Sequence, residues 1–149
     1  MAKYAVEMNR TASTSLAVGS WTSDATRPRR AKIYDWMFGS EASPADNAFL
    51  WQAQRCTTAG TNTGVTPQAL DGADAATESD AGENHTVDGT LTSAAILLSI
   101  PLNQRASYRW VAAPGGELIV PATASNGFHF RTPTATAVAV TSTIHVDEQ

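Results

Sequence analysis

The chain has 149 residues, of which 42% are hydrophobic and only 16% charged, with a formal net charge of −4 and one cysteine. This length suits one domain that buries a core unaided, and the single cysteine excludes an internal disulfide and a thiolate zinc site. The acidic balance argues against general nucleic-acid binding, and without a long apolar run or an apolar N-terminal stretch we expect neither a membrane span nor a signal peptide.

The first 25 residues are polar and rich in serine and threonine. We expect residues 1–25 to form an N-terminal segment or arm, with room for an edge strand, ahead of a single β-sandwich domain over residues 26–149. Trp21 falls outside any strong strand pattern. Because exposed apolar patches mark contact sites, Trp21 is a candidate for contact between copies of the chain.

A basic cluster follows this segment and is the only one in the sequence. It suits an acidic partner surface, and it equally suits a solvated turn that leads into a strand. Its members are Arg27, Arg29, Arg30 and Lys32.

Two segments with most of the aromatic residues come next, at residues 32–38 and 47–55. Both predict strands joined by a loop that contains Gly, Ser, Pro and Asp. A helix over residues 45–55 competes, because Ala, Leu, Gln and Arg favour it. We favour the strand, since Phe49 and Trp51 alternate with polar neighbours.

The middle of the chain is acidic, with six Asp or Glu and no basic residue between positions 56 and 104. Residues 57–90 contain few large aliphatic side chains, so we expect long loops around one or two short strands. Asp71 and Asp74, with the acids that follow, suggest oxygen ligands for calcium, but their spacing is not that of an EF-hand and solvated loops are commoner.

The remaining segments are short and β-branched, and prolines and glycines separate them. The apolar run 95–100 predicts a strand covered on both faces. Residues 136–146 alternate with a period of two and place Val138, Val140, Ile144 and Val146 on one face. Eight to ten such strands predict an all-β, antiparallel β-sandwich with long loops, of which the jelly roll is the commonest eight-stranded form. The other segments of this kind are 107–111, 118–120 and 128–130.

A search for chemistry finds no catalytic, cofactor-binding or metal-binding spacing. The three histidines do not fall at the spacings of metal sites, and His129 and His145 are expected on the polar faces of their strands. Cys56 is expected as a buried thiol at a strand end rather than a nucleophile. No phosphate-binding glycine pattern or nucleophilic serine elbow occurs, so we expect no enzyme and no cofactor.

Several segments resemble the capsid decoration, or cement, proteins of tailed bacteriophages. They are RAKIYDW (residues 30–36), PADNAFLWQAQR (44–55), VTPQALD (65–71), NQRASYRWVAAPGGE (103–117) and the β-rich C-terminal tail. The resemblance implies a jelly-roll β-sandwich, a homotrimer, and a place on the outer surface of the virion capsid after synthesis in the host cytoplasm. Its partners would be the major capsid protein and further copies of itself, with no nucleic acid, membrane or cofactor.

On this interpretation the protein stabilises a capsid by bridging its subunits, and the contacts can be assigned by residue. Arg27, Arg29, Arg30 and Lys32 would contact the capsid, while Trp21, Arg109 and Trp110 would contact other copies in a trimer. Two further classes stay open. One is a carbohydrate- or receptor-binding module of a phage appendage, which needs aromatic side chains on an open face. The other is a cupin-type enzyme, which needs a metal site rich in histidine.

Overall fold

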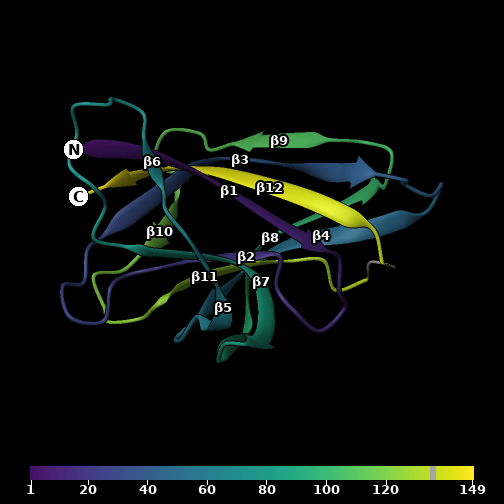
Figure 1. The fold of residues 1–149 in the computed structure, drawn as a ribbon, viewed down its shortest axis with the longest axis horizontal. Coiled ribbons are helices and arrows are strands. Elements are labelled where there is room, and N and C mark those ends of the chain that lie inside the picture. The colour runs from purple at the N-terminus through teal and green to yellow at the C-terminus, as the bar shows by residue number, and fades with distance from the viewer. Residues whose placement is uncertain (135–136) are drawn as a thin grey trace.

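The computed structural model describes residues 1–134 and 137–149 and contains two antiparallel sheets packed face to face as a β-sandwich (Figure 1). The first sheet has the order β10 (Leu118–Val120), β3 (Ala31–Ala42), β12 (Ala139–Glu148), β1 (Ala2–Thr11) and β6 (Gln68–Ala69), and β9 (Tyr108–Val111) also pairs with β3. The second sheet has the order β5 (Gly60–Val65), β7 (Asp80–Asp88), β2 (Gly19–Thr22), β11 (Gly127–Arg131), β4 (Ala48–Cys56) and β8 (Leu91–Asn103).

The strand order is that of a jelly roll with an insertion. If β5, β6 and β7 are set aside and β9 and β10 are taken as one interrupted strand on β3, each sheet keeps four strands. In chain order, these are the first, eighth, third and sixth strands in one sheet. The other sheet holds the second, seventh, fourth and fifth. Two Greek keys wound together give this order, so the predicted fold class is confirmed.

Alternating side chains form the core between the sheets. In β12, Val140, Ile144 and Val146 are buried, as their spacing predicts. The prediction began this strand at Thr136, which together with Ala135 lies outside the described residues. Aromatic rings fill the centre, where Trp36 of β3 meets Trp51 of β4 edge-on with ring centroids 6.1 Å apart. The strand prediction for 47–55 is therefore confirmed over its competing helix.

The N-terminal residues are not a separate arm. β1 pairs with β12 along its whole length, from Ala2 with Glu148 to Thr11 with Ala139, and β2 lies between β7 and β11 in the other sheet. Residues 1–25 therefore contribute a strand to each sheet. The polar composition misled the prediction because β1 needs only three large inward side chains, Tyr4, Val6 and Met8, to join the core.

Strand β8 also differs from expectation. It is the edge strand of the second sheet, paired only with β4, and the apolar run 95–100 is not covered on both faces, because part of it is exposed. Leu98, Ile100 and Leu102 turn toward the core and are half-buried, whereas Ile96 and Leu97 are exposed. A continuous apolar run predicts burial on both faces only where another layer packs over the outer face, and the exposure of Ile96 and Leu97 shows that no layer of this chain covers them.

The acidic middle forms more strand than expected, because β5 and β7 pair across residues 60–88. The loop from Leu70 to Ser79 is attached to the C-terminal strand through Glu148, whose carboxylate accepts hydrogen bonds from Thr77 and Ser79. At Asn84, which has a left-handed φ of 46°, β7 stops pairing with β2. Beyond it, Val87 and Asp88 pair with β5, and His85 and Asp88 lie against His129 on the outer face of the second sheet.

Candidate functional site

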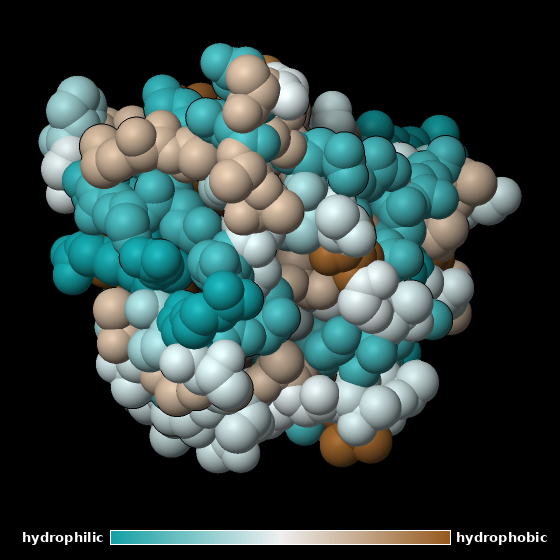
Figure 2. Space-filling view, turned by 60° about the vertical axis from the view of Figure 1, so that its left-hand side comes forward, coloured by the Kyte–Doolittle hydropathy of each residue, from teal (hydrophilic) through white to brown (hydrophobic). Residues whose placement is uncertain are grey.

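The predicted capsid-contact cluster lies on the loop between β2 and β3 and at the start of β3. Arg27, Arg29 and Arg30 are exposed, and Lys32 is half-buried. Arg27 forms an ion pair with Glu78 at 2.7 Å, so the cluster lies beside the acidic loop rather than apart from it. This face carries mostly hydrophilic side chains, with strongly hydrophobic ones in small separate spots (Figure 2). It therefore offers polar contacts of both signs.

Trp21, predicted as a contact between copies, has no side-chain surface to offer. It lies in β2, opposite Phe128 of β11, and is fully buried in the core. Its segment shows little alternation because all four residues of β2 are buried. The assignment of Trp21 to a trimer contact is corrected accordingly.

Arg109 and Trp110 lie on β9, at an open apolar side of the sandwich that we call the β8–β9 edge. Phe38 of β3 packs against Trp51 of β4, so these two strands face each other across the core. In the sheets, β9 pairs with β3 and β8 pairs with β4, so β9 and β8 lie on the same side of the sandwich. The exposed side chains of this edge are Ile96 (40%), Leu97 (46%), Tyr108 (47%) and Val111 (57%), and the half-buried ones are Leu98, Ile100, Leu102 and Trp110.

A buried carboxylate ties β9 to its sheet. Both Nε and Nη2 of Arg109 donate to Asp35 of β3, with Nη2 2.6 Å from Oδ2, and His145 Nδ1 of β12 lies 3.1 Å from the same oxygen. The hydrogen bonds from Arg109 lower the pKa of Asp35 most, and the charge of Arg109 and the contact with His145 lower it further. Together they outweigh burial, which raises the pKa, so the pKa lies below its ordinary value. Because 60% of the Arg109 side chain is exposed, it can still reach a neighbour.

An open hollow of about 570 Å³ lies along the same strands. Its lining combines one exposed aromatic ring, Tyr108, with charged and hydroxyl groups, including Glu41, Arg109 and Thr143. This is the chemistry that binds sugars by stacking and hydrogen bonding. Three of the four tryptophans, Trp21, Trp36 and Trp51, are fully buried and do not add to it.

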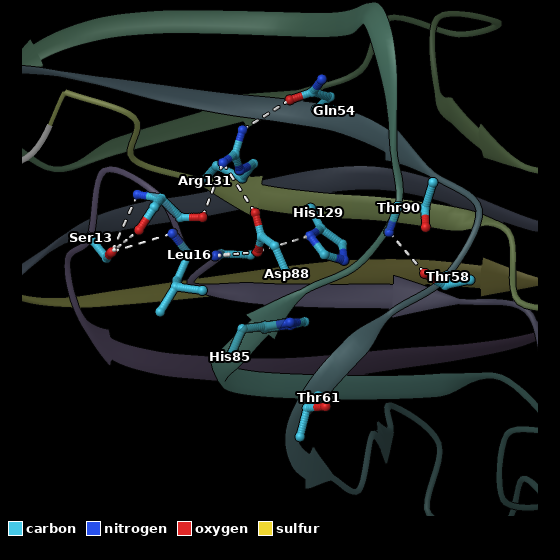
Figure 3. Close-up of polar contacts among 12 residues, drawn as sticks. Ser13, Leu16, Gln54, Thr58, Thr61, His85, Asp88, Thr90, His129 and Arg131 are labelled. Atoms are coloured by element: carbon cyan, nitrogen blue, oxygen red, sulfur yellow. Dashed lines mark hydrogen bonds and ion pairs between the residues drawn. The ribbon is translucent and has the colours of Figure 1, made fainter.

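A second cluster, which the sequence did not predict, is buried beneath the outer layer of the second sheet (Figure 3). His129 lies between Phe128 and Phe130 on β11, and because those two rings face the core its own ring faces outward. The second half of β7 covers it with His85 and Asp88. The two imidazole rings lie 4.8 Å apart between centroids, and both are fully buried. The expectation that His129 is a surface residue is therefore wrong, because a covering strand seals its face.

Asp88 is held firmly within this cluster. Its Oδ1 accepts the Ala17 amide hydrogen at 2.8 Å, and its Oδ2 lies 3.1 Å from Nη2 of Arg131. Burial raises the pKa of Asp88, but the contacts with His129, Ala17 and Arg131 outweigh burial and lower the pKa below its ordinary value. Arg131 is itself fixed by Gln54 Oε1 at 3.2 Å. The carboxylate is therefore charged and oriented at neutral pH.

The histidine rings are poorly supplied with partners. Neither nitrogen of His85 or of His129 has a hydrogen-bond partner of normal geometry, although His129 Nδ1 approaches Asp88 Oδ1 at 3.5 Å and the Ala59 backbone lies near His85. Burial, reinforced by the neighbouring His129, lowers the pKa of His85 to about 4, so that ring is neutral at pH 7. A buried nitrogen without a hydrogen-bond partner lowers the stability of the fold, so this cluster needs an explanation such as a bound ligand.

Cys56, at the end of β4, is a buried thiol as predicted. Burial raises its pKa to about 12, which keeps it protonated and unreactive at neutral pH. The calcium suggestion gains no support, because the described residues bring only His85, Asp88 and His129 together as a group of three metal-ligating side chains.

Comparison with known proteins identifies no relative, since neither a protein-family model nor a curated protein matches the chain. Within the described residues, no helix is long and apolar enough to span a membrane.

Proposed function

We propose that this chain is a decoration protein that binds the outside of a tailed-bacteriophage capsid and reinforces it by bridging major capsid protein subunits. The sequence resemblance suggests the class, and one structural observation supports it. That observation is the β8–β9 edge, a long strand edge of the sandwich with exposed and half-buried apolar side chains. Edges of this kind are covered by partners in working proteins, because unpaired backbone and apolar surface otherwise promote aggregation.

The proposed occupant of the β8–β9 edge is a second copy of the chain, in a homotrimer. Isoleucine, leucine, valine and tyrosine side chains predominate among its exposed and half-buried members, as in the buried centres of oligomer interfaces. Arg109 and Trp110 lie on this edge, so both keep their predicted role as trimer contacts. The basic cluster lies away from the β8–β9 edge and remains available for contact with the capsid. Its members are Arg29, Arg30, Lys32 and Arg27, the last of which is paired with Glu78.

Reinforcement would follow from multivalency rather than from chemistry. A trimer whose three copies each contact a capsid subunit must lose several contacts together before it leaves the shell. Modest individual interfaces then give slow release and resist the pressure of packaged DNA. The proposal needs no catalytic group, and Cys56 is too buried and too weakly acidic to supply one.

The test uses particles of the virus that encodes the chain. The protein should co-purify with assembled capsids at fixed stoichiometry, and particles stripped of it should keep their size but release DNA at a lower temperature than intact particles. Adding back the purified chain should restore the higher temperature. Stripped particles that withstand heat as well as intact ones would contradict reinforcement.

A carbohydrate- or receptor-binding module is the second candidate, and the hollow beside Tyr108 favours it. On that account, stripped particles would survive heating and fail to adsorb to cells. The purified chain would also bind glycans on an array, and replacement of Tyr108 by alanine would abolish that binding. Heat-sensitive stripped particles that adsorb normally would exclude this candidate.

A further inference from the structure

The buried cluster of His85, Asp88 and His129 brings together three side chains from two separate parts of the chain. His85 and Asp88 are three residues apart on β7, while His129 belongs to β11, and β2 lies between these two strands in the sheet. One donor atom from each side chain lies within 4.8 Å of the other two. Nothing in the capsid proposal uses this cluster, so it requires an explanation of its own.

The donor set is specific in its chemistry. Two imidazole nitrogens and one carboxylate oxygen match the ligands of zinc and of neighbouring late first-row divalent ions, whereas calcium and magnesium prefer oxygen alone. The surroundings also have the form of a metal site, since the carboxylate is fixed from behind by the Ala17 amide and by Arg131. Oδ1 of Asp88 retains a lone pair that can face a metal ion, because the amide uses only one.

Burial supplies the independent observation. Both rings are fully buried, yet their four nitrogens have no hydrogen-bond partner of normal geometry. An ion bound to one nitrogen of each ring would remove two of these four deficits at once. Donors about 2.0–2.1 Å from one tetrahedral zinc ion lie roughly 3.4 Å from each other. Donor atoms that are now up to 4.8 Å apart would therefore approach by about 1.4 Å when the ion binds.

We propose that His85, Asp88 and His129 form a structural binding site for one divalent transition-metal ion of the zinc type. The ion would fasten the second half of β7 to β11 and so hold the covering layer on the second sheet. Arg131 and Arg10 are the nearby cations. Arg131 contacts Asp88 and Gln54, although its Nε has no hydrogen-bond partner, and Arg10 donates to the carbonyl oxygen of His85.

The test measures metal binding by the untagged, full-length chain after removal of metal with a chelator. We expect one equivalent of Co²⁺ to bind, with visible d–d absorption, and one equivalent of Zn²⁺ to displace it. His129→Gln and His85→Gln should each lower the affinity for Co²⁺ at least tenfold, because loss of even a hydrogen-bond partner of a ligand typically costs about that much. His145→Gln is the matched control, because His145 also contacts a buried carboxylate but lies outside the cluster, and it should bind like the parent.

A second measurement requires no variant, in case the buried substitutions prevent folding. The chain has three histidines, so the side-chain NMR signals of all three can be followed while Zn²⁺ is added. We expect the signals of His85 and His129 to shift together and saturate at one equivalent, with His145 unchanged. Absence of stoichiometric binding by the parent chain would overturn the proposal. So would equal binding by the His129→Gln variant, or unchanged signals from His85 and His129.

Discussion

At the scale of single residues, Trp51 shows how much stability one core ring carries. It is fully buried and touches Trp36, Phe38 and Phe49 through its ring. Trp51→Ala should lower the free energy of unfolding by about 3–5 kcal/mol, because the variant loses the hydrophobic transfer energy of the ring and leaves a cavity in the core. Urea denaturation measures this. Trp110→Ala is the matched control, with a smaller loss because its ring is only half-buried. A Trp51→Ala variant that unfolds at the same urea concentration as the parent would contradict this expectation.

Asp35 makes stability depend on pH. Because its pKa is lowered in the folded state, its stabilising effect is present above the ordinary pKa of about 3.9 and is lost as the pH falls through the folded value. Asp35→Asn should therefore cost about 1–2 kcal/mol at pH 7, a modest figure because solvent screens the exposed Arg109. The difference from the parent should shrink below pH 4.

Urea denaturation at several pH values checks this expectation. Asp74→Asn, on the exposed loop after β6, should match the parent throughout and serves as the control. A loss in Asp35→Asn that is the same at pH 7 and pH 3 would show that the carboxylate charge is not what stabilises the three strands.

The residue scale is also where sequence reasoning missed the most. Alternation placed His129 correctly on the face opposite Phe128 and Phe130, but alternation alone does not reveal that a later strand covers that face. The partner, His85, is 44 positions away and reaches the site only because β7 leaves β2 at Asn84. A search for ligand spacing within one segment finds no such pair. For Trp21 the difficulty was similar, since a strand buried on both faces shows no alternation.

At the scale of elements, period-two alternation predicted β4 and β12, because core and non-core side chains alternate along each of them. The inserted β5–β7 block was less visible, because its small side chains bury little surface and its order comes from pairing with β2. Whether another layer covers the outer face of a strand depends on the path of the chain, which explains the misjudged β8.

The β8–β9 edge gives a prediction about assembly. If copies meet there, the parent chain should sediment at three times its mass of 15.7 kDa. The double variant I96D/L97D should sediment as a monomer, because two buried charges without partners oppose association. Its circular dichroism should be unchanged, since both positions are exposed in the single chain.

The control for this experiment is Leu70→Asp, which places a charge on an equally exposed apolar position away from the edge. This variant should remain a trimer. A parent chain that is monomeric at micromolar concentration, or a double variant that remains trimeric, would contradict the assigned interface.

At the scale of the whole molecule, the pairing of the first strand with the last makes the fold one cooperative unit. Removal of residues 1–11 would expose one edge of β12 and take Tyr4, Val6 and Met8 from the core. We expect the shortened chain to lose its cooperative thermal transition. A chain that lacks only residues 1–2 should unfold like the parent. Thermal unfolding followed by circular dichroism distinguishes the two.

The opposite result would restore the idea of a detachable arm. If the chain without residues 1–11 unfolds cooperatively near the temperature of the parent but no longer binds capsids, then β1 serves the partner and not the sandwich. The sequence could predict the class of fold from its strands, but not this pairing, because contacts between the two ends of a chain leave no local pattern.

Ala2 and Glu148 face each other across β1 and β12, so the two ends of the chain emerge side by side (Figure 1). A short flexible linker could therefore join them, and new ends could be opened in the exposed loop at residues 71–76. Such a circular permutant keeps every strand pairing, and its new ends lie close to the old ones, because Tyr4 contacts Ala75 and Glu148 contacts Thr77. The same geometry lets the order in which the strands are synthesised be changed without altering the core.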